Sequence, residues 1–423
     1  MAGPIPLGLL PDTAWVSADG RLSIGGCDLV DLAGEYGTPL FVYDEAHLRA
    51  RCREAVAAFG DGVAYASKAF LCGAMARLAH EEGMHLDVAT GGELFVARRA
   101  GVPADRLVMH GNNKSDVELV MALDEGVGRI VVDSFDELDR LDGLAAATGS
   151  RPRVLLRITP GVEVHTHEFI ATGQDDSKFG FTVSSGLAAA AVERAIASDS
   201  VELVGLHAHV GSQVFEVGAF ARVVEVLAGF AAPFGLAELS VGGGLGVPYV
   251  EGESAPSISE WAAGIRAVCE AYGVTASVSA EPGRSIVAAA AVTLYTVGTI
   301  KDLPGIRTYV AVDGGMSDNP RPVLYGSGYE TFLPRAPAAD RPRPVRVVGK
   351  HCESGDLLVR EGWVPGDLAV GDVLATPVTG AYGHAMGSNY NHVLRPAVVF
   401  VADGDAREVV RRETFEDLVR REA

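Results

Sequence analysis

Eight short apolar runs, each followed by a stretch with helical character, dominate the chain between residues 60 and 287. Each run ends in Gly or polar residues, and the stretch after it is rich in Ala and Leu. Strands that alternate with helices form parallel sheets, and eight such units are the number that closes a (β/α)8 barrel. We therefore predict an α/β fold whose main domain, residues 38–287, is a TIM-type barrel. The eight runs are Val63–Ser67, His85–Ala89, Arg106–Met109, Arg129–Val132, Val154–Ile158, Leu203–Ala208, Leu239–Val241 and Ala276–Ala280.

The pattern changes after residue 287. Helical periodicity fades and β-branched runs separated by Asp-Gly or Gly-Asp turns follow, which predicts an all-β C-terminal domain over residues 288–423. Residues 14–25 have the pattern of a hairpin with its turn at Ala18-Asp19-Gly20, so we expect the N-terminal segment, residues 1–37, to contribute strands to the β domain. The expected strands of that domain are Val292–Ile300, Thr308–Val312, Val345–Val348, Val373–Pro377 and Ala397–Val401.

Charge and cysteine content indicate which partners and which cellular compartment to expect. The formal net charge of −20 repels phosphate backbones and anionic membranes, so we expect no nucleic-acid partner and no membrane association. No apolar stretch is expected to reach membrane-spanning length, and no basic region precedes an apolar run at the N-terminus. The five cysteines are scattered and form no CxxC pair, which disfavours a disulfide framework or a structural zinc site. These features predict a cytoplasmic protein.

Polar side chains collect at the ends of the predicted strands, where barrels of this type place their chemistry. Loops are polar in any protein, but eight polar strand ends together favour a catalytic site. The strand ends carry, in chain order, Lys68, Asp87, His110, Asp133, Arg157, His207–Ser212, Gly242–Gly244 and Glu281–Arg284.

Three of these strand ends suggest a cofactor with a phosphate and a ring nitrogen. Lys68 has apolar neighbours and is one of only five lysines, so it is either a Schiff-base lysine or an exposed surface lysine. The Gly242–Gly244 turn offers close backbone approach and N–H groups to a phosphate, and Ser212 and Arg284 on neighbouring strand ends could add donors. Glu281 could hold a pyridinium nitrogen protonated, or form an ordinary salt bridge with Arg284.

Two further features have open interpretations. The pairs His207/His209 and His165/His167 have the spacing of two ligands on one face of a strand, but no further His or Cys cluster completes either site. We therefore predict no metal, and a stacking or hydrogen-bonding histidine instead. Cys352 lies among polar residues in the predicted β domain and is either a buried structural cysteine or a proton donor.

These residues, in this order, resemble the fold-type III pyridoxal-phosphate-dependent decarboxylases over almost the whole chain, from Gly37 to Pro396. The Cys352–Asp356 sequence Cys-Glu-Ser-Gly-Asp favours the branch that acts on diaminopimelate over the ornithine and arginine branches. The resemblance implies a pyridoxal 5'-phosphate cofactor and decarboxylation of meso-2,6-diaminopimelate at its D centre to L-lysine and CO2, the last step of lysine biosynthesis. The alternatives are another diamino acid or carboxynorspermidine as substrate. The matching motifs are Lys68-Ala69, His207–Gln213, Gly242–Gly244, Glu281–Arg284, Cys352–Asp356 and Ser388–Asn391.

The resemblance also implies a role for each site residue. Lys68 would bind the cofactor covalently, and Cys352 would return a proton after decarboxylation. His209 would stack on the cofactor ring, and Glu281 would pair with its pyridine nitrogen, whereas alanine racemases of this fold place Arg there. The remaining cofactor contacts would be Asp87, Ser212, Gly244, Gly283, Arg284 and Tyr382, and the contacts to the amino-acid substrate would be Arg284, Arg321, Tyr325, Glu353 and Tyr382.

Two consequences of the resemblance concern assembly and specificity. Members of the family are typically dimers in which each active site borrows the residues at Cys352 and Glu353 from the partner, so we expect a homodimer with shared sites. This chain departs from many relatives at Phe70, where they have Asn, and at His384 and His392 in a variable C-terminal motif. These departures affect substrate detail rather than the chemistry of the cofactor.

Overall fold

The computed structural model describes residues 2–162 and 175–423. The chain divides into two compact units. The barrel unit comprises Arg51–Gly246 and Ala255–Ser285, and the β unit comprises Met1–Ala50, Val247–Ser254 and Ile286–Ala423. His165 and His167, one of the two histidine pairs considered as metal ligands, lie outside the described residues.

The barrel unit contains the eight predicted parallel strands, in sequence order around the sheet. The sheet closes on itself because the amide of Ala64 donates to the Ala280 carbonyl at 3.0 Å and the amide of Ala66 to the Pro282 carbonyl at 3.1 Å. The prediction of a TIM-type barrel is therefore confirmed. Its strands are β5 (Ala64–Ala66), β6 (His85–Val88), β7 (Leu107–Met109), β8 (Arg129–Val132), β9 (Arg153–Thr159), β11 (Glu202–His207), β12 (Glu238–Ser240) and β13 (Ser277–Ser279), with the short β10 (Phe181–Thr182) beside β9.

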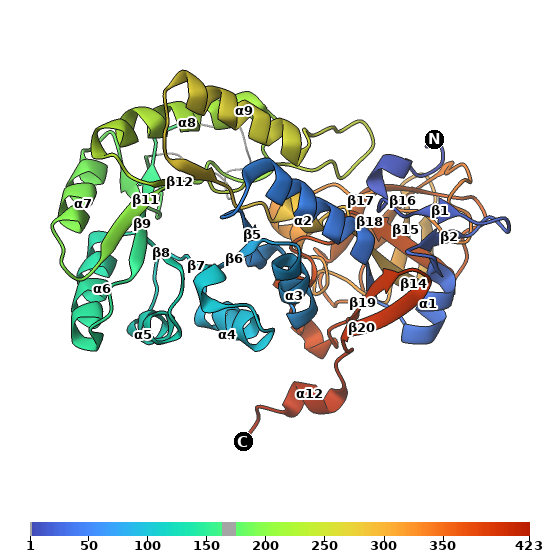
Figure 1. The fold of residues 1–423 in the computed structure, drawn as a ribbon. Helices are drawn as coiled ribbons and strands as arrows, with labels where there is room; N and C mark the ends of the chain where they lie inside the picture. The colour runs from blue at the N-terminus through green and yellow to red at the C-terminus, as the bar shows by residue number, and fades with distance from the viewer. Residues whose placement is uncertain (1, 163–174) are drawn as a thin grey trace. The chain divides into compact units, whose positions relative to one another are not determined.

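Helices follow the strands and lie outside them (Figure 1). Local sequence signals fix where several of them begin and end. Ser115 and Ser257 form capping boxes with the glutamates three residues later, and Gly126 ends its helix in the left-handed conformation. The helices are α2 (Glu45–Phe59), α3 (Gly73–Glu81), α4 (Gly91–Arg99), α5 (Asp116–Glu125), α6 (Phe135–Thr148), α7 (Leu187–Ile196), α8 (Val217–Ala231), α9 (Ile258–Ala271) and α10 (Arg284–Val287), with the 3-10 turns η2 (Ser67–Ala69), η3 (Ala104–Arg106) and η5 (Ala232–Phe234).

Side chains that point into the barrel form three layers, because alternate residues of a strand face the same side. The middle layer is small and apolar: Ala64, Val108, Val131, Leu155 and Val204 pack as one buried cluster. At the N-terminal ends of the strands, Glu238 pairs with both Arg129 and Arg153. At the C-terminal ends the layer is polar yet buried, and consists of Asp87, His110, Asp133, Arg157, His207 and Glu281. A buried polar layer at this end is where a barrel enzyme carries its active site.

One expectation about apolar stretches is wrong. Among the described residues, Val217–Phe234 is long and apolar enough, by length and composition, to cross a membrane. This segment is α8 together with the short η5, and it is a helix of the barrel. Its Phe220 ring packs on Trp261 of α9 with the centroids 5.1 Å apart, and the faces of both helices that carry these residues are buried. The apolar character of α8 therefore serves helix packing in the barrel unit.

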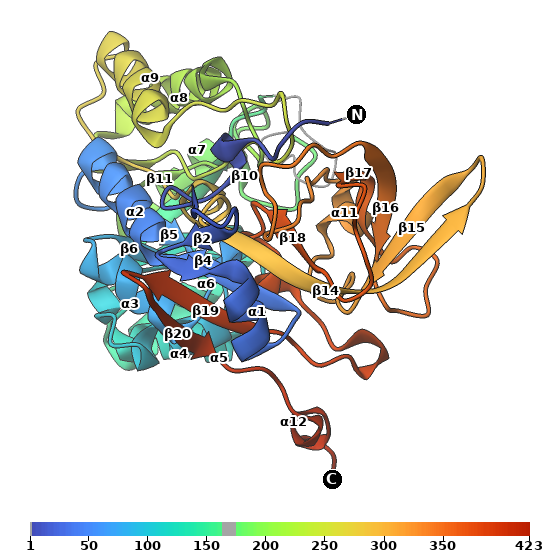
Figure 2. The same ribbon diagram turned by 90° about the vertical axis from the view of Figure 1, so that its right-hand side faces the viewer.

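The β unit is built on a mixed sheet with the strand order β17-β16-β15-β14-β4-β19-β20, and β18 pairs with β14 beside this path. The 13-residue β14 pairs with β4, β15 and β18, so it connects the whole sheet (Figure 2). The strands are β4 (Leu40–Asp44), β14 (Ala291–Leu303), β15 (Arg307–Val312), β16 (Arg343–Val348), β17 (Leu357–Val364), β18 (Val373–Pro377), β19 (Ala397–Ala402) and β20 (Asp405–Val410); the helices and 3-10 turns are η1 (Leu7–Leu9), α1 (Leu29–Tyr36), α11 (Arg321–Tyr325), α12 (Phe415–Val419), η6 (His384–Met386) and η7 (Tyr390–His392).

The N-terminal part of the chain extends further into the β unit than the sequence predicts. The expected hairpin forms from β1 (Trp15–Val16) and β2 (Leu22–Ile24), and β3 (Cys27–Asp28) adds a third antiparallel strand. Residues 38–50, assigned to the barrel from their sequence, instead belong to the β unit, where Leu40–Asp44 form β4 between β14 and β19. All five residues of β4 are buried, as both faces of a central strand require.

Candidate active site

Glu281 lies at the centre of the polar layer in the barrel unit, just after β13. Its Oε2 atom is 3.0 Å from His207 Nε2, and its Oε1 atom accepts a hydrogen bond of 3.0 Å from the Ser240 hydroxyl. The Nε2 atom of His110 lies 3.4 Å from Glu281 and 3.7 Å from Asp87. Strands β7, β11 and β12 thus each supply one side chain that holds this carboxylate in place.

The charges of this cluster follow from burial and mutual contact. Burial by itself raises the pKa of Glu281, but His207 and His110 outweigh it and hold that pKa well below its usual range. Burial tends to lower the pKa of His110, yet the carboxylates of Asp87 and Glu281 raise it overall. Burial lowers the pKa of His207 against the opposing effect of the Glu281 carboxylate. Glu281 is therefore a buried, ionised carboxylate, as a partner for a protonated pyridine nitrogen must be.

The glycine turn after β12 is built for close backbone packing. A Cβ atom at Gly242 would lie 2.4 Å from the Ala208 carbonyl oxygen, one at Gly243 2.3 Å from the Glu281 carbonyl oxygen, and one at Gly244 2.4 Å from the Gly211 carbonyl oxygen. The sequence suggested that all three amides could serve a phosphate. However, Gly242 N–H donates to Ser240 at 3.3 Å and Gly243 N–H to His209 at 3.1 Å, which leaves Gly244 as the glycine of this turn that suits a ligand.

The other predicted phosphate ligands lie together on the same unit. Arg284, the first residue of α10, donates a hydrogen bond of 2.8 Å to the Ser212 hydroxyl. Gly283 packs so tightly that an added Cβ would lie 2.9 Å from the Cβ of Ala66. A guanidinium bound to a hydroxyl next to a glycine turn is a set of donors that fits a phosphate. The residues therefore fit the phosphate end of the cofactor as well as its ring nitrogen.

His209 is buried and held through one of its ring nitrogens. Its Nδ1 atom accepts from Gly243 N–H, so the proton of the neutral ring is on Nε2. Burial, followed by the positive charges of Lys68 and Arg157, lowers the pKa of His209 well below its usual range. A neutral imidazole fixed through one nitrogen can lie flat against an aromatic ring.

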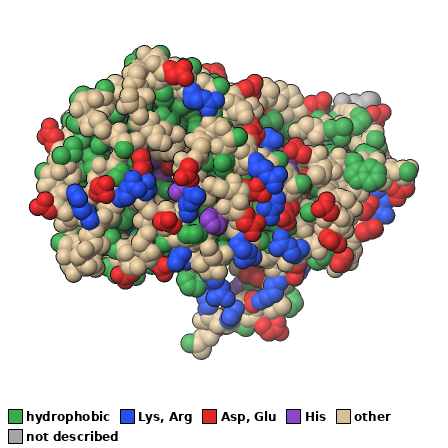
Figure 3. All heavy atoms as spheres, viewed as in Figure 1, with side chains coloured by type: hydrophobic (Ala, Val, Ile, Leu, Met, Phe, Trp, Pro, Cys, Tyr) green, Lys and Arg blue, Asp and Glu red, His purple; other side chains and the backbone are tan. Residues whose placement is uncertain are grey.

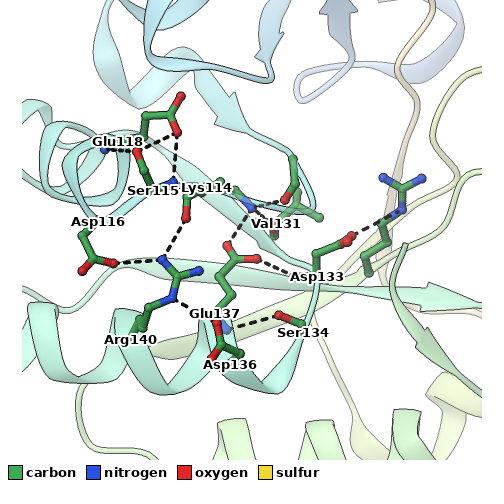
Figure 4. Close-up of polar contacts among 12 residues, drawn as sticks. Lys114, Ser115, Asp116, Glu118, Val131, Asp133, Ser134, Asp136, Glu137 and Arg140 are labelled. Atoms are coloured by element: carbon green, nitrogen blue, oxygen red, sulfur yellow. Dashed lines mark hydrogen bonds and ion pairs between the residues drawn. The ribbon is translucent and has the colours of Figure 1, made fainter. Parts of the chain in front are cut away.

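The two lysines at this end of the barrel differ in their surroundings. Lys68, on η2, is exposed, and its charge acts on Asp87, Glu93 and His209. Lys114 is buried, and its Nζ donates to the Gly111 and Val131 carbonyls at 2.7 Å and to Glu137 at 2.6 Å (Figure 4). The amine of Lys114 is therefore occupied by structural hydrogen bonds, whereas the side chain of Lys68 is exposed and can react with a ligand.

The network around Lys114 continues to the polar layer. The second oxygen of Glu137 accepts from the amide of Asp133 at 3.0 Å (Figure 4). The Asp133 carboxylate lies 3.8 Å from Arg157. The guanidinium of Arg157 lies 4.1 Å from the centre of the Phe179 ring. Buried charges that are paired in this way hold their strand ends rigidly, which pre-organises the site.

A set of possible metal ligands also occurs among the described residues. One donor atom each from His110, His207 and Glu281 lie within 4.8 Å of one another. This set differs from the sequence pair His207/His209, because His209 turns to the glycine turn instead. The group could hold a divalent ion, but it would then occupy the carboxylate that the cofactor nitrogen requires.

In the β unit, Arg321 is the first residue of α11, and it is buried with 4% of its surface exposed. Its guanidinium donates a hydrogen bond to the phenol of Tyr329, and no carboxylate pairs with it among the described residues. Tyr325 and Tyr382 are half-buried in the same unit, and Tyr382 has a positive φ of 59°. A buried guanidinium without an anion is a site for a ligand carboxylate.

Cys352 and Glu353 lie exposed on the loop between β16 and β17. Asn391 Oδ1 accepts from the amide of Cys352 at 3.2 Å and lies 3.3 Å from His351 Nδ1. His351 Nε2 lies 2.9 Å from the Ser317 hydroxyl, and the amide of His351 donates to Asp356 at 2.8 Å. Cys352 is exposed, unlike the other four cysteines. The alternative of a buried structural cysteine at 352 is therefore wrong.

The predicted site residues divide into two groups, one in each unit. In the barrel unit these are Lys68, Asp87, His209, Ser212, Gly244, Glu281, Gly283 and Arg284; in the β unit they are Arg321, Tyr325, Cys352, Glu353 and Tyr382. His110 and Ser240 were not assigned roles from the sequence, although both contact Glu281. Strand alternation could have found them, since His110 follows inward-facing Val108 by two residues and Ser240 follows Glu238 by two.

The fold and the polar layer define an α/β-barrel enzyme that is fitted for a phosphorylated ligand with a ring nitrogen. A family model for the "Pyridoxal-dependent decarboxylase, pyridoxal binding domain" matches residues 45–288. The chain belongs to this decarboxylase family, and the resemblance seen in the sequence is confirmed.

The chain is similar over almost its whole length to diaminopimelate decarboxylases of several organisms. The chain is 50% identical over 421 residues to the diaminopimelate decarboxylase of Mycobacterium tuberculosis, covering 95% of this chain and 94% of that protein. It is 45% identical to the diaminopimelate decarboxylase of Bacillus subtilis, covering 97% of both chains. The crystal structure of diaminopimelate decarboxylase from M. jannaschii in complex with L-lysine matches with a TM-score of 0.90 at 33% identity, covering 97% of this chain and 98% of that chain.

Proposed function

We propose that this chain decarboxylates meso-2,6-diaminopimelate at its D centre, giving L-lysine and CO2, with pyridoxal 5'-phosphate as cofactor. The observation that supports this substrate is Arg321, a buried guanidinium without a carboxylate partner among the described residues. Diaminopimelate carries a carboxylate at its far end, whereas lysine and ornithine do not. The relatives named above, and the lysine bound to one of them, favour the same substrate over carboxynorspermidine or another diamino acid.

Bound pyridoxal phosphate would supply an electron sink for the electron pair released when the carboxylate leaves. Glu281, held by His207 and Ser240, would keep the ring nitrogen protonated. Ser212, Gly244 and Arg284 would hold the phosphate, with Gly283 and Asp87 beside the cofactor. His209 would stack on the ring, and Lys68 would hold the cofactor covalently.

The residues of the β unit would orient the substrate and complete the reaction. Arg321, Tyr325, Tyr382 and Glu353 would contact the amino acid, together with Arg284 of the barrel unit. Cys352, exposed on its loop, would return the proton to the carbon that has lost CO2. Because this loop is anchored by Asn391 and Asp356, the thiol would be presented in one place.

Assembly and location are also part of the proposal. We propose a homodimer in which Cys352 and Glu353 of each subunit serve the partner's site. Five free cysteines agree with a reducing, cytoplasmic location. Acidic and basic side chains are interspersed on the face seen in Figure 3, and the formal net charge of −20 disfavours a nucleic-acid partner. No metal is proposed, because Glu281 is assigned to the cofactor.

Product analysis tests the function directly. Purified protein with added pyridoxal phosphate should release lysine and CO2 from meso-diaminopimelate, and it should turn over D- and L-lysine or D- and L-ornithine poorly. Sites that bind a substrate group in a buried polar contact reject analogues without it by factors up to roughly 10⁴–10⁵. Arg321→Ala should lose most of that preference. Equal turnover of lysine or ornithine by the parent would refute the substrate and leave the decarboxylase class intact.

A further inference from the structure

Two tyrosines hold Arg321 in the β unit. Its Nη1 atom donates a hydrogen bond of 2.5 Å to the phenol of Tyr329, and its guanidinium carbon lies 4.2 Å from the centre of the Tyr249 ring. The rings of Tyr249 and Tyr329 meet edge to face, with centroids 5.2 Å apart and an interplanar angle of 79°. All three side chains are buried. Uncharged groups thus fix the guanidinium on one face and at one nitrogen.

The remaining edge of Arg321 is suited to a carboxylate. Nη1 is committed to Tyr329, whereas Nε has no hydrogen-bond partner among the described residues. Nε and Nη2 form the second edge of the guanidinium, and their spacing matches the two oxygens of a carboxylate. A buried cation is stable only with a compensating anion. No described residue provides this anion, so a group other than the described residues must supply it.

Tyr249 reaches Arg321 through an insertion in the barrel sequence. It follows Gly244 of the glycine turn by five residues, and its segment, Val247–Ser254, belongs to the β unit rather than to the barrel unit. The side chain of Glu253 accepts from the amide of Tyr249 at 2.7 Å and closes this short segment on itself. The ring of Tyr249 is thereby held by a compact turn, so it can fix the plane of the guanidinium.

We infer that Tyr249 and Tyr329 are specificity-determining positioning residues, which hold Arg321 without neutralising it and so select amino acids that carry a second carboxylate. The inference rests on the proposed function and extends it to residues to which that proposal gives no role. An Asp or Glu in place of Tyr329 would compensate the cation within the protein, and a substrate carboxylate would then gain little by binding. A phenol and a π face orient the guanidinium and leave its charge available.

D-Lysine is the matched probe, because it is diaminopimelate without the carboxylate at the far end. The experiment measures kcat and KM for meso-diaminopimelate and D-lysine in the parent, Tyr329→Phe, Tyr249→Leu and Tyr249→Phe holoenzymes. Tyr329→Phe and Tyr249→Leu should each lower kcat/KM for diaminopimelate on the order of 10-fold or more, mostly through KM, since each loses one contact to a charged group. Turnover of D-lysine should change less than about 3-fold, because it does not use the lost contact. Tyr249→Phe keeps the π face and should retain most of the parent's preference.

The outcomes separate the inference from the function on which it rests. If the parent makes lysine from diaminopimelate but the variants lose activity equally on both substrates, or lose only kcat, the tyrosines have a structural role and the inference is wrong. If Tyr249→Phe is as defective as Tyr249→Leu, the π contact is not what positions Arg321. A parent that does not decarboxylate diaminopimelate overturns the proposed function, and the inference with it. Unfolding midpoints and cofactor absorbance of each variant show whether its fold and cofactor site are intact.

Discussion

The Nε2 atom of His207 lies 3.0 Å from Oε2 of Glu281, and both side chains are buried at the C-terminal end of the barrel. His207 ends β11 and Glu281 follows β13, with Ser240 of β12 between them. Because the carboxylate must stay ionised and correctly aimed to hold a pyridine nitrogen, His207 should contribute to cofactor affinity although it does not contact the cofactor in the proposed site. A hydrogen bond to a charged group contributes about 1.5–3 kcal/mol.

We therefore expect His207→Ala to raise the dissociation constant of pyridoxal phosphate on the order of 10-fold or more. Equilibrium dialysis of the cofactor against variant and parent measures this change. His85→Asn is the matched control, because His85 faces into the same barrel near Asp61 and Arg106 at the N-terminal ends of the strands. Unchanged affinity in His207→Ala, or an equal loss in both variants, would contradict the role given to His207.

Lys68 should be the residue that binds the cofactor covalently. It is exposed at the end of the barrel that carries the polar layer, whereas Lys114 at the same end is buried and bound to Glu137. Borohydride reduction of the holoenzyme followed by peptide mapping should place the pyridoxyl group on Lys68, and Lys68→Ala should show no such adduct. An adduct on Lys114, Lys178, Lys301 or Lys350 would refute the assignment.

The barrel was predictable because its signals are local. Each strand is a short apolar run, and each helix that follows has its own periodicity and often its own cap, as at Ser115 and Ser257. Strand pairing over long sequence separations was not predictable. The run Leu40–Asp44 looks like a barrel strand, but it pairs with β14 and β19, which lie about 250 and 350 residues later in the chain. Strands β17 and β20 were not predicted, because charged residues such as Arg360 and Glu408 interrupt their apolar patterns.

For the site, the sequence predicted residue types and strand ends but not their mutual contacts. Lys68, Glu281 and Arg284 could be proposed because each ends or follows an apolar run. The amide of Gly242 donates to Ser240, two residues earlier, whereas the amide of Gly243 donates to His209 from another strand end. Such contacts depend on three-dimensional packing, which strand spacing alone does not specify.

A dimer with shared sites predicts complementation between two inactive variants. Lys68→Ala and Cys352→Ala remove groups that, in the proposal, meet across the subunit interface. Mixing the two variants under conditions that allow subunit exchange should restore part of the activity, because a mixed dimer holds one site with both residues intact. Mixtures of either variant with itself are the control. The absence of recovery, when mass measurements show that subunits have exchanged, would exclude shared sites.

Asp318 should make the stability of the protein depend on pH. Burial and, to a lesser degree, the nearby charges of Asp313 and Asp356 raise the pKa of this carboxyl from 3.8 to about 7. A hydrogen bond from the amide of Gly315 opposes this rise. Between these two values the unfolded chain has lost the proton and the folded chain keeps it. The free energy of unfolding therefore falls as pH rises through this window, and the contribution of Asp318 is fully present only below pH 3.8.

Asp318→Asn should remove this dependence, because an amide is neutral at every pH in the window. The difference in unfolding free energy between variant and parent should shift in favour of the variant from pH 4.5 to pH 7.5, by a few kcal/mol at most, since one pKa unit corresponds to about 1.4 kcal/mol. Chemical denaturation at several pH values measures it. Asp124→Asn, at an exposed position of α5, is the control for the substitution itself. A difference that stays constant across the window would show that Asp318 does not titrate there.

Asn391 should matter for the proton that Cys352 returns. Its side-chain oxygen accepts from the amide of Cys352 at 3.2 Å and lies 3.3 Å from Nδ1 of His351, so one amide group fixes the loop that carries the thiol. Asn391 also has a positive φ of 52°, a conformation that Asn tolerates better than most residues. Asn391→Ala loses both contacts, whereas Asn391→Asp keeps an acceptor oxygen and tolerates the same backbone.

A loop that no longer holds the thiol in one position should slow proton return and leave substrate binding largely unchanged. We expect Asn391→Ala to lower kcat on the order of 10-fold with little change in KM, and Asn391→Asp to recover most of the loss, because misplacing a reacting group by about 1 Å can cost about 100-fold. Asn389→Ala is the matched control, since Asn389 bonds to Val393 and Glu413 rather than to the Cys352 loop. Steady-state kinetics with meso-diaminopimelate measures both constants. An equal rise in KM for Asn391→Ala and Asn389→Ala, with kcat unchanged, would show that Asn391 supports the general fold of this segment and not the position of Cys352.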